Sequence, residues 1–158
     1  MRMQASVHVV IVWKTGMIVK QRSRMNGETD LKKLLRNMQP KRNAGEYVYC
    51  TVESKAQAME LDPLCMFVED ESVTVILPKD KADSLRLPYP AIFAWITLTV
   101  HSSLEAVGLT SAVAHALTEA RISCNVVAAY YHDHIFVPVN DAKKAMQVLL
   151  ILSGANHE

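Results

Sequence analysis

The chain has 158 residues, of which half are hydrophobic and 21% are charged, and its formal net charge is +1. This composition is typical of a globular protein with its own core, and no apolar run reaches the roughly 20 residues that a membrane span needs. Residues 1–24 contain five basic and no acidic residues, which leaves 12 basic against 16 acidic residues elsewhere. A mildly acidic body argues against nucleic acid as the main partner.

Three cysteines, Cys50, Cys65 and Cys124, are widely spaced and form no CxxC pair. An odd number of isolated thiols fits small buried side chains in a reducing compartment better than disulfides or a zinc site. We therefore expect a cytoplasmic protein.

The segment before Met25 stands apart from the rest of the chain. Residues 6–13, SVHVVIVW, could form the short core of an export signal, but Lys14 ends the run and no small-residue cleavage pattern follows. Helical patterning begins at Met25, a second methionine. We interpret residues 1–24 as a leader, either mis-started or disordered, rather than as an export signal.

Residues 26–88 contain signals for both helices and strands. Leucine spacing predicts a short helix within residues 26–40, with Asp30 or Thr29 at its start and Pro40 as its stop. Downstream we expect a turn at residues 41–45, a strand at 46–52 and a connector of uncertain structure at 53–63. Two strands around a polar turn follow at residues 64–78, and a short helix at 79–85.

Residues 89–152 continue the alternation. A long apolar strand belongs in the middle of a sheet, because it has no polar face for solvent. We expect this strand at residues 91–100, a loop at 101–108 and a helix at 109–122. Two strands that form a hairpin follow at residues 124–131 and 134–139, and a final helix at 140–152.

A short pattern occurs twice along the chain. LPKDKADSL begins at Leu77 and VPVNDAKKA begins at Val137, and in both a proline follows a hairpin and precedes a helix. Proline suits this position because its missing N–H would have no partner there. The repeat predicts two copies of one unit, and the second copy reads β-α-β-β-α. This order predicts a ferredoxin-like α+β fold, with antiparallel sheets and helices on one face.

The second copy, GLTSAVAHALTEARISCNVVAAYYHDHIFVPVNDAKKAMQVL, resembles the ACT domain, a module that senses small molecules. Upstream, GETDLKKLL, GEYVYCTV and FVEDESVTVILP are similar to the N-terminal half of stand-alone bacterial ACT proteins. The resemblance is to the tandem type, which also occurs in aspartokinase regulatory regions and cytosolic arginine sensors. It implies a degenerate ACT-like lobe in residues 25–88, an ACT domain in residues 89–152 and a tail in residues 153–158.

The chain ends before the fourth strand of a complete βαββαβ unit. We expect another segment to occupy that sheet edge, either residues 47–52 or a second chain, because an open edge invites pairing. The sheet edges therefore also predict a homodimer or a larger assembly.

The tripeptide His132-Asp133-His134 could be a metal site or the turn of a hairpin. Histidines at i and i+2 of a strand share one side, but a metal would need further ligands from elsewhere. His101 and His115 could complete a set of four ligands, but only their number suggests it. The resemblance implies a hairpin whose polar residues face water, and we prefer that interpretation. The five glycines are too scattered for a dinucleotide or phosphate motif, so we predict no catalytic residue, metal or cofactor.

The loop before the helix of residues 109–122 is the candidate ligand site. Gly108 lets the backbone turn sharply, and the first N–H groups of the helix would be free to bind a carboxylate. Glu105 could bind an ammonium group, and the resemblance implies that the strand after the helix also contributes. The candidate residues are Ser103, Glu105, Val107, Gly108, Leu109, Thr110, Ser111, Asn125 and Val126. The alternative is that Thr110 and Ser111 only cap the helix.

The leading hypothesis is a non-enzymatic regulatory protein that binds a small ligand, an amino acid, at a lobe or subunit interface. The second hypothesis is a structural or protein-interaction module without a ligand. A remote third is a metal-dependent enzyme that uses His132 and His134.

Overall fold

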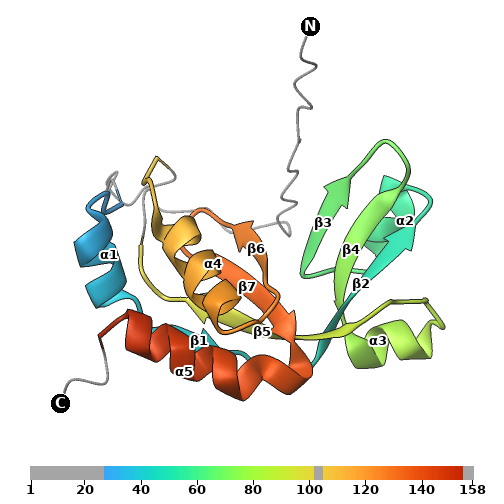
Figure 1. Ribbon diagram of the computed structural model, residues 1–158. Coiled ribbons are helices and arrows are strands. Elements are labelled where there is room, and N and C mark those ends of the chain that lie inside the picture. Colours follow the sequence, from blue (N-terminus) through green and yellow to red (C-terminus); the bar gives the residue numbers. More distant parts are fainter. Residues whose placement is uncertain (1–26, 102–104, 155–158) are drawn as a thin grey trace, which may run out of the picture. The chain divides into compact units, whose positions relative to one another are not determined.

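The computed structural model describes residues 27–101 and 105–154, and the predicted leader lies outside them. Within the described residues the chain forms two compact units (Figure 1). The first unit comprises residues 47–92, and the second comprises residues 27–46 and 93–154.

The first unit is a three-stranded antiparallel sheet with two short helices. Its elements are β2 (Tyr47–Val52), α2 (Lys55–Glu60), β3 (Cys65–Val68), β4 (Val73–Pro78) and α3 (Lys79–Ser84). Strand β4 lies between β2 and β3, and both helices contact β2 and β4. The predicted hairpin around the polar turn at residues 70–72 is confirmed, and so is the short helix that follows it.

The second unit is a four-stranded antiparallel sheet in the order β1-β5-β7-β6. Its elements are α1 (Leu31–Asn37), β1 (Pro40–Arg42), β5 (Ile92–Leu98), α4 (Leu109–Glu119), β6 (Asn125–Ala128), β7 (Asp133–Pro138), the 3₁₀ turn η1 (Val139–Asp141) and α5 (Ala142–Leu152). Asp30 caps α1, since its side chain accepts a hydrogen bond from the Lys33 N–H at 3.1 Å.

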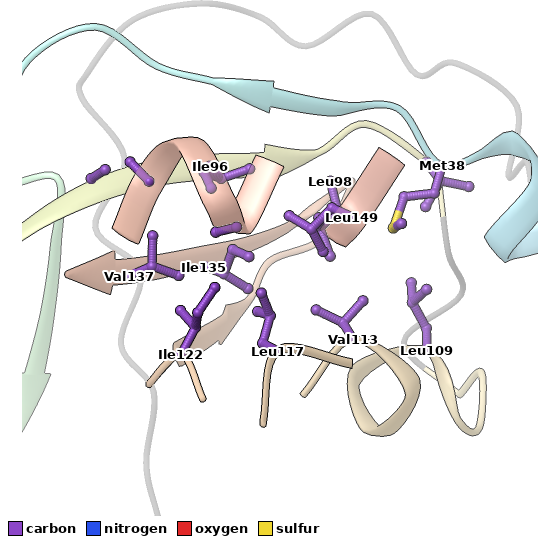
Figure 2. Close-up of a cluster of buried hydrophobic side chains, with 14 of the residues drawn as sticks. Met38, Ile96, Leu98, Leu109, Val113, Leu117, Ile122, Ile135, Val137 and Leu149 are labelled. Carbon is purple, nitrogen blue, oxygen red and sulfur yellow. The ribbon is translucent and has the colours of Figure 1, made fainter. Parts of the chain in front are cut away.

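The core of the second unit lies between its sheet and helices α4 and α5. Alternate residues of β5 and β7 face the helices, as the two-residue period of a strand requires. Figure 2 shows side chains from both strands facing those of α4, with Leu149 of α5 among them. The labelled buried residues of this cluster are Met38, Ile96, Leu98, Leu109, Val113, Leu117, Ile122, Ile135, Val137 and Leu149.

The structure confirms the internal repeat. Strand β4 pairs with β2 so that Val73 lies opposite Val52, and β7 pairs with β5 so that Asp133 lies opposite Leu98. The two strands have the same burial pattern, and each ends in the proline that begins the next helical segment. The predicted ferredoxin-like α+β fold is therefore confirmed.

Three details differ from the prediction. Residues 41–45 were predicted as a turn, but Lys41 and Arg42 belong to β1, which pairs with β5 along residues 96–98. Strand β1 was not among the segments predicted for this sheet edge. The connector of uncertain structure contains α2, and the strand predicted for residues 124–131 stops at Ala128 because the hairpin turns there.

Candidate ligand site

The loop after β5 leads to α4, and the first N–H groups of this helix find no acceptor among the described residues. Gly108 is the N-cap of α4, with a φ of 105°, and no side chain caps the helix. The first intrahelical hydrogen bond runs from the Ala112 N–H to the Gly108 carbonyl, at 2.8 Å. Within the described part of the chain, the N–H groups of residues 109–111 find no acceptor. These donors and the helix dipole favour an anion at this point.

Leu31 of α1 lies against Gly108. A Cβ atom built on Gly108 would come within 3.0 Å of the Leu31 Cδ2, so the close contact and the positive φ both require glycine. The Glu28 N–H also donates to the His101 carbonyl at 3.1 Å. One side of the loop is therefore covered by the segment that begins α1.

Asp133 is a buried carboxylate at the start of β7. Its side chain is only 6% exposed, and strand alternation puts it on the helix-facing side with Ile135 and Val137. No described residue forms a hydrogen bond with its carboxyl group. Burial raises the pKa of this carboxyl group, and the nearby His132 opposes that shift in part.

The sheet register places Asp133 at the end of the unit where the loop begins. Asp133 is opposite Leu98, the last residue of β5, from which the chain continues into the loop. In Figure 2, Leu98 lies toward the Val113 end of α4, whereas Val137 lies toward Ile122. The buried carboxylate therefore lies at the same end of the unit as the N-terminus of α4.

The other predicted residues do not all meet at this place. Ser103 lies outside the described residues, and Val107 projects from the loop with 85% of its surface exposed. The Leu109 side chain is in the core, so only its N–H can face a ligand. Thr110 and Ser111 lie in the first turn of α4, where both are exposed, and Glu105 is exposed in the loop.

Asn125 and Val126 lie toward the opposite end of β6. In the register, Ala128 is opposite Asp133, while Asn125 is opposite Phe136. Three residues of strand span about 10 Å, so Asn125 is removed from the loop within its own unit. The structure places residues 108–111 and Asp133 at the same end of the second unit, and Asn125 lies toward the other end.

The His132-Asp133-His134 segment forms the end of the turn and the start of β7. The turn is closed by the Ala129 N–H, which donates to the His132 carbonyl at 3.3 Å, so the hairpin is confirmed. The expectation that all its polar residues face water is wrong for Asp133, whose side chain faces the core. Among residues 27–101 and 105–154, no group of three or more His, Cys, Asp or Glu could hold a metal ion.

Sequence reasoning missed Asp133 because it treated the tripeptide only as a metal site or a turn. Two signals pointed to its burial. Asp133 has the same strand parity as the apolar Ile135 and Val137. In the internal repeat it also corresponds to Val73, a core residue of the first unit.

The equivalent place in the first unit is closed. Only Glu53 and Ser54 separate β2 from α2, and the Ser54 hydroxyl accepts a hydrogen bond from the Gln57 N–H at 3.2 Å. The Gln57 side chain in turn accepts from the Glu53 N–H at 3.1 Å, which completes a reciprocal cap. Val73, 4% exposed, occupies the position that Asp133 holds in the second unit. The open helix end and the buried carboxylate therefore belong to the second unit.

No helix among the described residues is long and apolar enough to span a membrane. This is consistent with the absence of a long apolar run from the sequence.

Two family models of the ACT domain match the chain, one over residues 26–94 and the other over residues 92–150. No functionally curated protein matches it significantly. A solved structure of a Vibrio cholerae protein of unknown function, described as a possible transport protein, is 47% identical. It has a TM-score of 0.72 and covers 78% of this chain and 95% of its own.

More distant structures share the fold. A protein described as a C-terminal regulatory domain of aspartate kinase from Porphyromonas gingivalis has a TM-score of 0.53 at 15% identity, and the match covers 73% of this chain and 96% of that one. Escherichia coli aspartokinase III, in complex with aspartate and ADP, has a TM-score of 0.55 at 15% identity. That match covers 75% of this chain and 33% of the kinase. The chain belongs to the ACT-domain family and carries two ACT domains in tandem.

Proposed function

We propose that this protein is a non-enzymatic regulator that binds a free amino acid at the second unit. The α-carboxylate would accept hydrogen bonds from the N–H groups of residues 109–111, and the α-ammonium would pair with Asp133. The observation that carries the proposal is the difference between the two units. In the first unit Ser54 caps the helix and the apolar Val73 holds the repeat position of Asp133, whereas in the second unit no side chain caps the helix and Asp133 is buried.

The charges of an amino acid fit this arrangement. A carboxylate at a helix N-terminus is favoured by free N–H groups and by the helix dipole. A buried carboxylate without a partner is costly, and an ammonium group would remove much of that cost. A ligand that carries both charges on one carbon therefore suits a site with donors on one side and a carboxylate on the other.

The structural relatives support an amino acid as the ligand class. Two of them are described as an aspartate kinase regulatory domain and as an aspartokinase bound to aspartate. The resemblance implies that a further module, in this chain or in a second one, covers the remaining side of the ligand. Binding would favour one arrangement of modules, and it could change a partner only by its differential affinity for the two states.

The proposal includes a cytoplasmic location and assembly into a homodimer or larger oligomer. Three isolated cysteines support a reducing compartment. Strand β6 lies at the edge of the second unit's sheet and is available for pairing with a second copy.

A thermal-shift screen with the twenty amino acids tests the proposal. At least one amino acid should raise the Tm of the wild-type protein, and Asp133→Asn should remove that shift because the amide keeps the shape but loses the charge. Asp70→Asn is the matched control, since Asp70 is exposed in the β3–β4 turn. A flat response from folded wild-type protein, or a full response from Asp133→Asn, would contradict amino-acid binding at this site.

One observation favours the second hypothesis, a protein-interaction module. Exposed Tyr130 and Tyr131 lie with ring centroids 4.9 Å apart, and Tyr131 is 5.5 Å from the His101 ring. Exposed aromatic pairs are common in protein interfaces. Sedimentation analysis of Tyr130→Ser/Tyr131→Ser separates the two functions. Loss of self-association with an intact amino-acid response would assign these tyrosines to an interface and leave the ligand site unaffected.

A further inference from the structure

The sheet face that points away from α4 and α5 carries a chain of hydrogen bonds centred on His134. The Trp95 indole N–H donates to the His134 Nδ1 at 3.0 Å, and the Thr97 hydroxyl lies 3.1 Å from the same nitrogen. The Asn43 side-chain amide donates to the Thr97 hydroxyl at 2.9 Å. The Asn43 backbone N–H also donates to the Trp95 carbonyl at 2.9 Å, so the segment after β1 is tied to β5 at this place.

These contacts fix the protonation state of His134. An indole N–H can only donate, so the His134 Nδ1 must accept and therefore carries no proton. The Thr97 hydroxyl accepts from Asn43, which leaves its own proton to donate to the same Nδ1. The imidazole is therefore neutral, with its hydrogen on Nε2. A proton added at Nδ1 would face the Trp95 indole N–H and displace it, whereas the Thr97 hydroxyl would have to turn round and accept.

Few other charges reach this imidazole. Burial lowers the pKa of His134, and His132, which lies just before β7, lowers it further. Lys41 of β1 lies opposite Thr97, and the uncharged Val127 of β6 lies opposite His134. Asp133 immediately precedes His134 in β7, but strand alternation directs its side chain to the other face of the sheet.

The first unit has no histidine at the position equivalent to His134. Thr74 takes the position of His134, and its hydroxyl donates to the Glu69 carboxylate. Tyr49 takes the position of Trp95, since it lies opposite Ile76 as Trp95 lies opposite Phe136. Both ionisable residues at the start of β7, Asp133 and His134, therefore replace uncharged residues of the first unit, Val73 and Thr74.

We propose that His134 is a pH-sensitive latch on the β6–β7 hairpin. While neutral, it joins Trp95 of β5 and the Asn43–Thr97 pair to the strand that carries Asp133. When it is protonated, the Trp95 indole N–H is displaced, the Thr97 hydroxyl must reorient and the hairpin loosens. The consequence for ligand affinity rests on the proposed function, because Asp133 lies in the same strand, on the face of the ligand site.

The direction of the pH effect follows from the contacts. The pKa of His134 lies below the ordinary value of 6.5 in the folded protein, so the unfolded chain takes up the proton first. The stability that the latch contributes is present above pH 6.5 and is lost as the pH falls through that value toward the folded pKa.

Tryptophan fluorescence of the full chain tests the latch without any ligand. Trp13 and Trp95 are the two tryptophans, so Trp13→Phe makes Trp95 the sole reporter. In that background the Trp95 emission should titrate with a midpoint below 6.5, because an imidazolium beside an indole quenches it. His134→Gln should abolish the titration, since its amide oxygen still accepts from Trp95 but does not titrate in this range. His132→Gln, the matched control two residues away, should retain it. Emission that does not titrate between pH 4 and 7.5, or a titration that persists in His134→Gln, would overturn the latch.

The twenty-amino-acid thermal-shift screen, repeated at pH 5 and pH 7.5, tests the coupling to the ligand site. Any stabilising amino acid should lose more of its effect at pH 5 in the wild type than in His134→Gln. Any loss that remains in the variant comes from groups other than His134. An equal loss in both proteins would overturn the coupling. If no amino acid stabilises the protein at either pH, the proposed function fails, while the fluorescence titration still decides the latch.

Discussion

The two units of this protein share one framework and differ at the place where a ligand could bind. Both pair their central strands in the same register, and both begin their last helical segment at a proline. The first unit closes its helix end with Ser54 and has Val73 in its core. The second unit leaves the helix end open at Gly108 and buries Asp133. The comparison separates what the fold requires from what it does not.

Val73 shows that an apolar side chain satisfies the fold at this position. A carboxylate at the equivalent place lowers stability unless something pairs with it. The same holds for the open helix end, which a serine caps in the first unit. Both features of the second unit therefore cost stability, and the proposed ligand site would account for them together.

The largest effect is expected where the two units are alike. Ile135→Ala in β7 should lower the free energy of unfolding by about 2–5 kcal/mol, because Ile135 is fully buried in the core of the second unit. The matched change Val75→Ala in β4 should cost less, about 1.5–3 kcal/mol, since fewer methyl groups are removed. Urea unfolding of both variants measures the difference. Equal, small effects would mean that the two cores are not built alike.

Gly108 should tolerate no side chain. Gly108→Ala should cost about 2 kcal/mol or more, since it combines a positive φ with contact to Leu31. Gly154→Ala is the control, because Gly154 also has a positive φ but nothing lies within 4 Å of its added Cβ. It should cost only about 1 kcal/mol. Equal losses in urea unfolding would show that Leu31 does not constrain Gly108. This strain also means that substitutions of Gly108 test folding before they test ligand binding.

The two helix ends should respond differently to loss of hydroxyl groups. Ser54→Ala should lower stability by about 1 kcal/mol because it removes a cap from α2. Thr110→Ala should change stability little, since no side chain caps α4. Thermal unfolding of the two variants makes this comparison, and a larger loss at Thr110 than at Ser54 would contradict an open helix end.

Asp133→Val should stabilise the protein slightly. The change restores the residue type of the first unit, and we expect a gain of about 1 kcal/mol at neutral pH. Because burial raises the pKa of Asp133, the ionised wild type is penalised above its folded pKa. The advantage of the variant should therefore shrink as the pH falls through the folded pKa, and it should be smallest below 3.8, where the carboxyl group is protonated in both folded and unfolded chains. Unfolding across that range checks it, and a variant that is less stable at neutral pH would show that Asp133 has a structural partner.

The main hairpins and helices could be predicted from the sequence because their patterns are local. Alternation in the β3–β4 and β6–β7 hairpins and leucine spacing in α1 were sufficient. Strand β1 could not be predicted, since so short a strand shows no period and its partner, β5, lies far along the chain. Asp133 was missed because a polar residue near a turn favours a solvent-facing interpretation. Its strand parity with Ile135 and Val137 points the other way, and the structure confirms that Asp133 is buried.

Amide NMR titration with the most strongly stabilising amino acid tests the central claim most directly. The account predicts that the amide signals of residues 108–111 shift, together with that of Asp133, while those of Ser54 and Gln57 stay in place. Shifts centred on the first unit, or no shifts in a folded sample, would contradict a ligand site at the open helix end of the second unit.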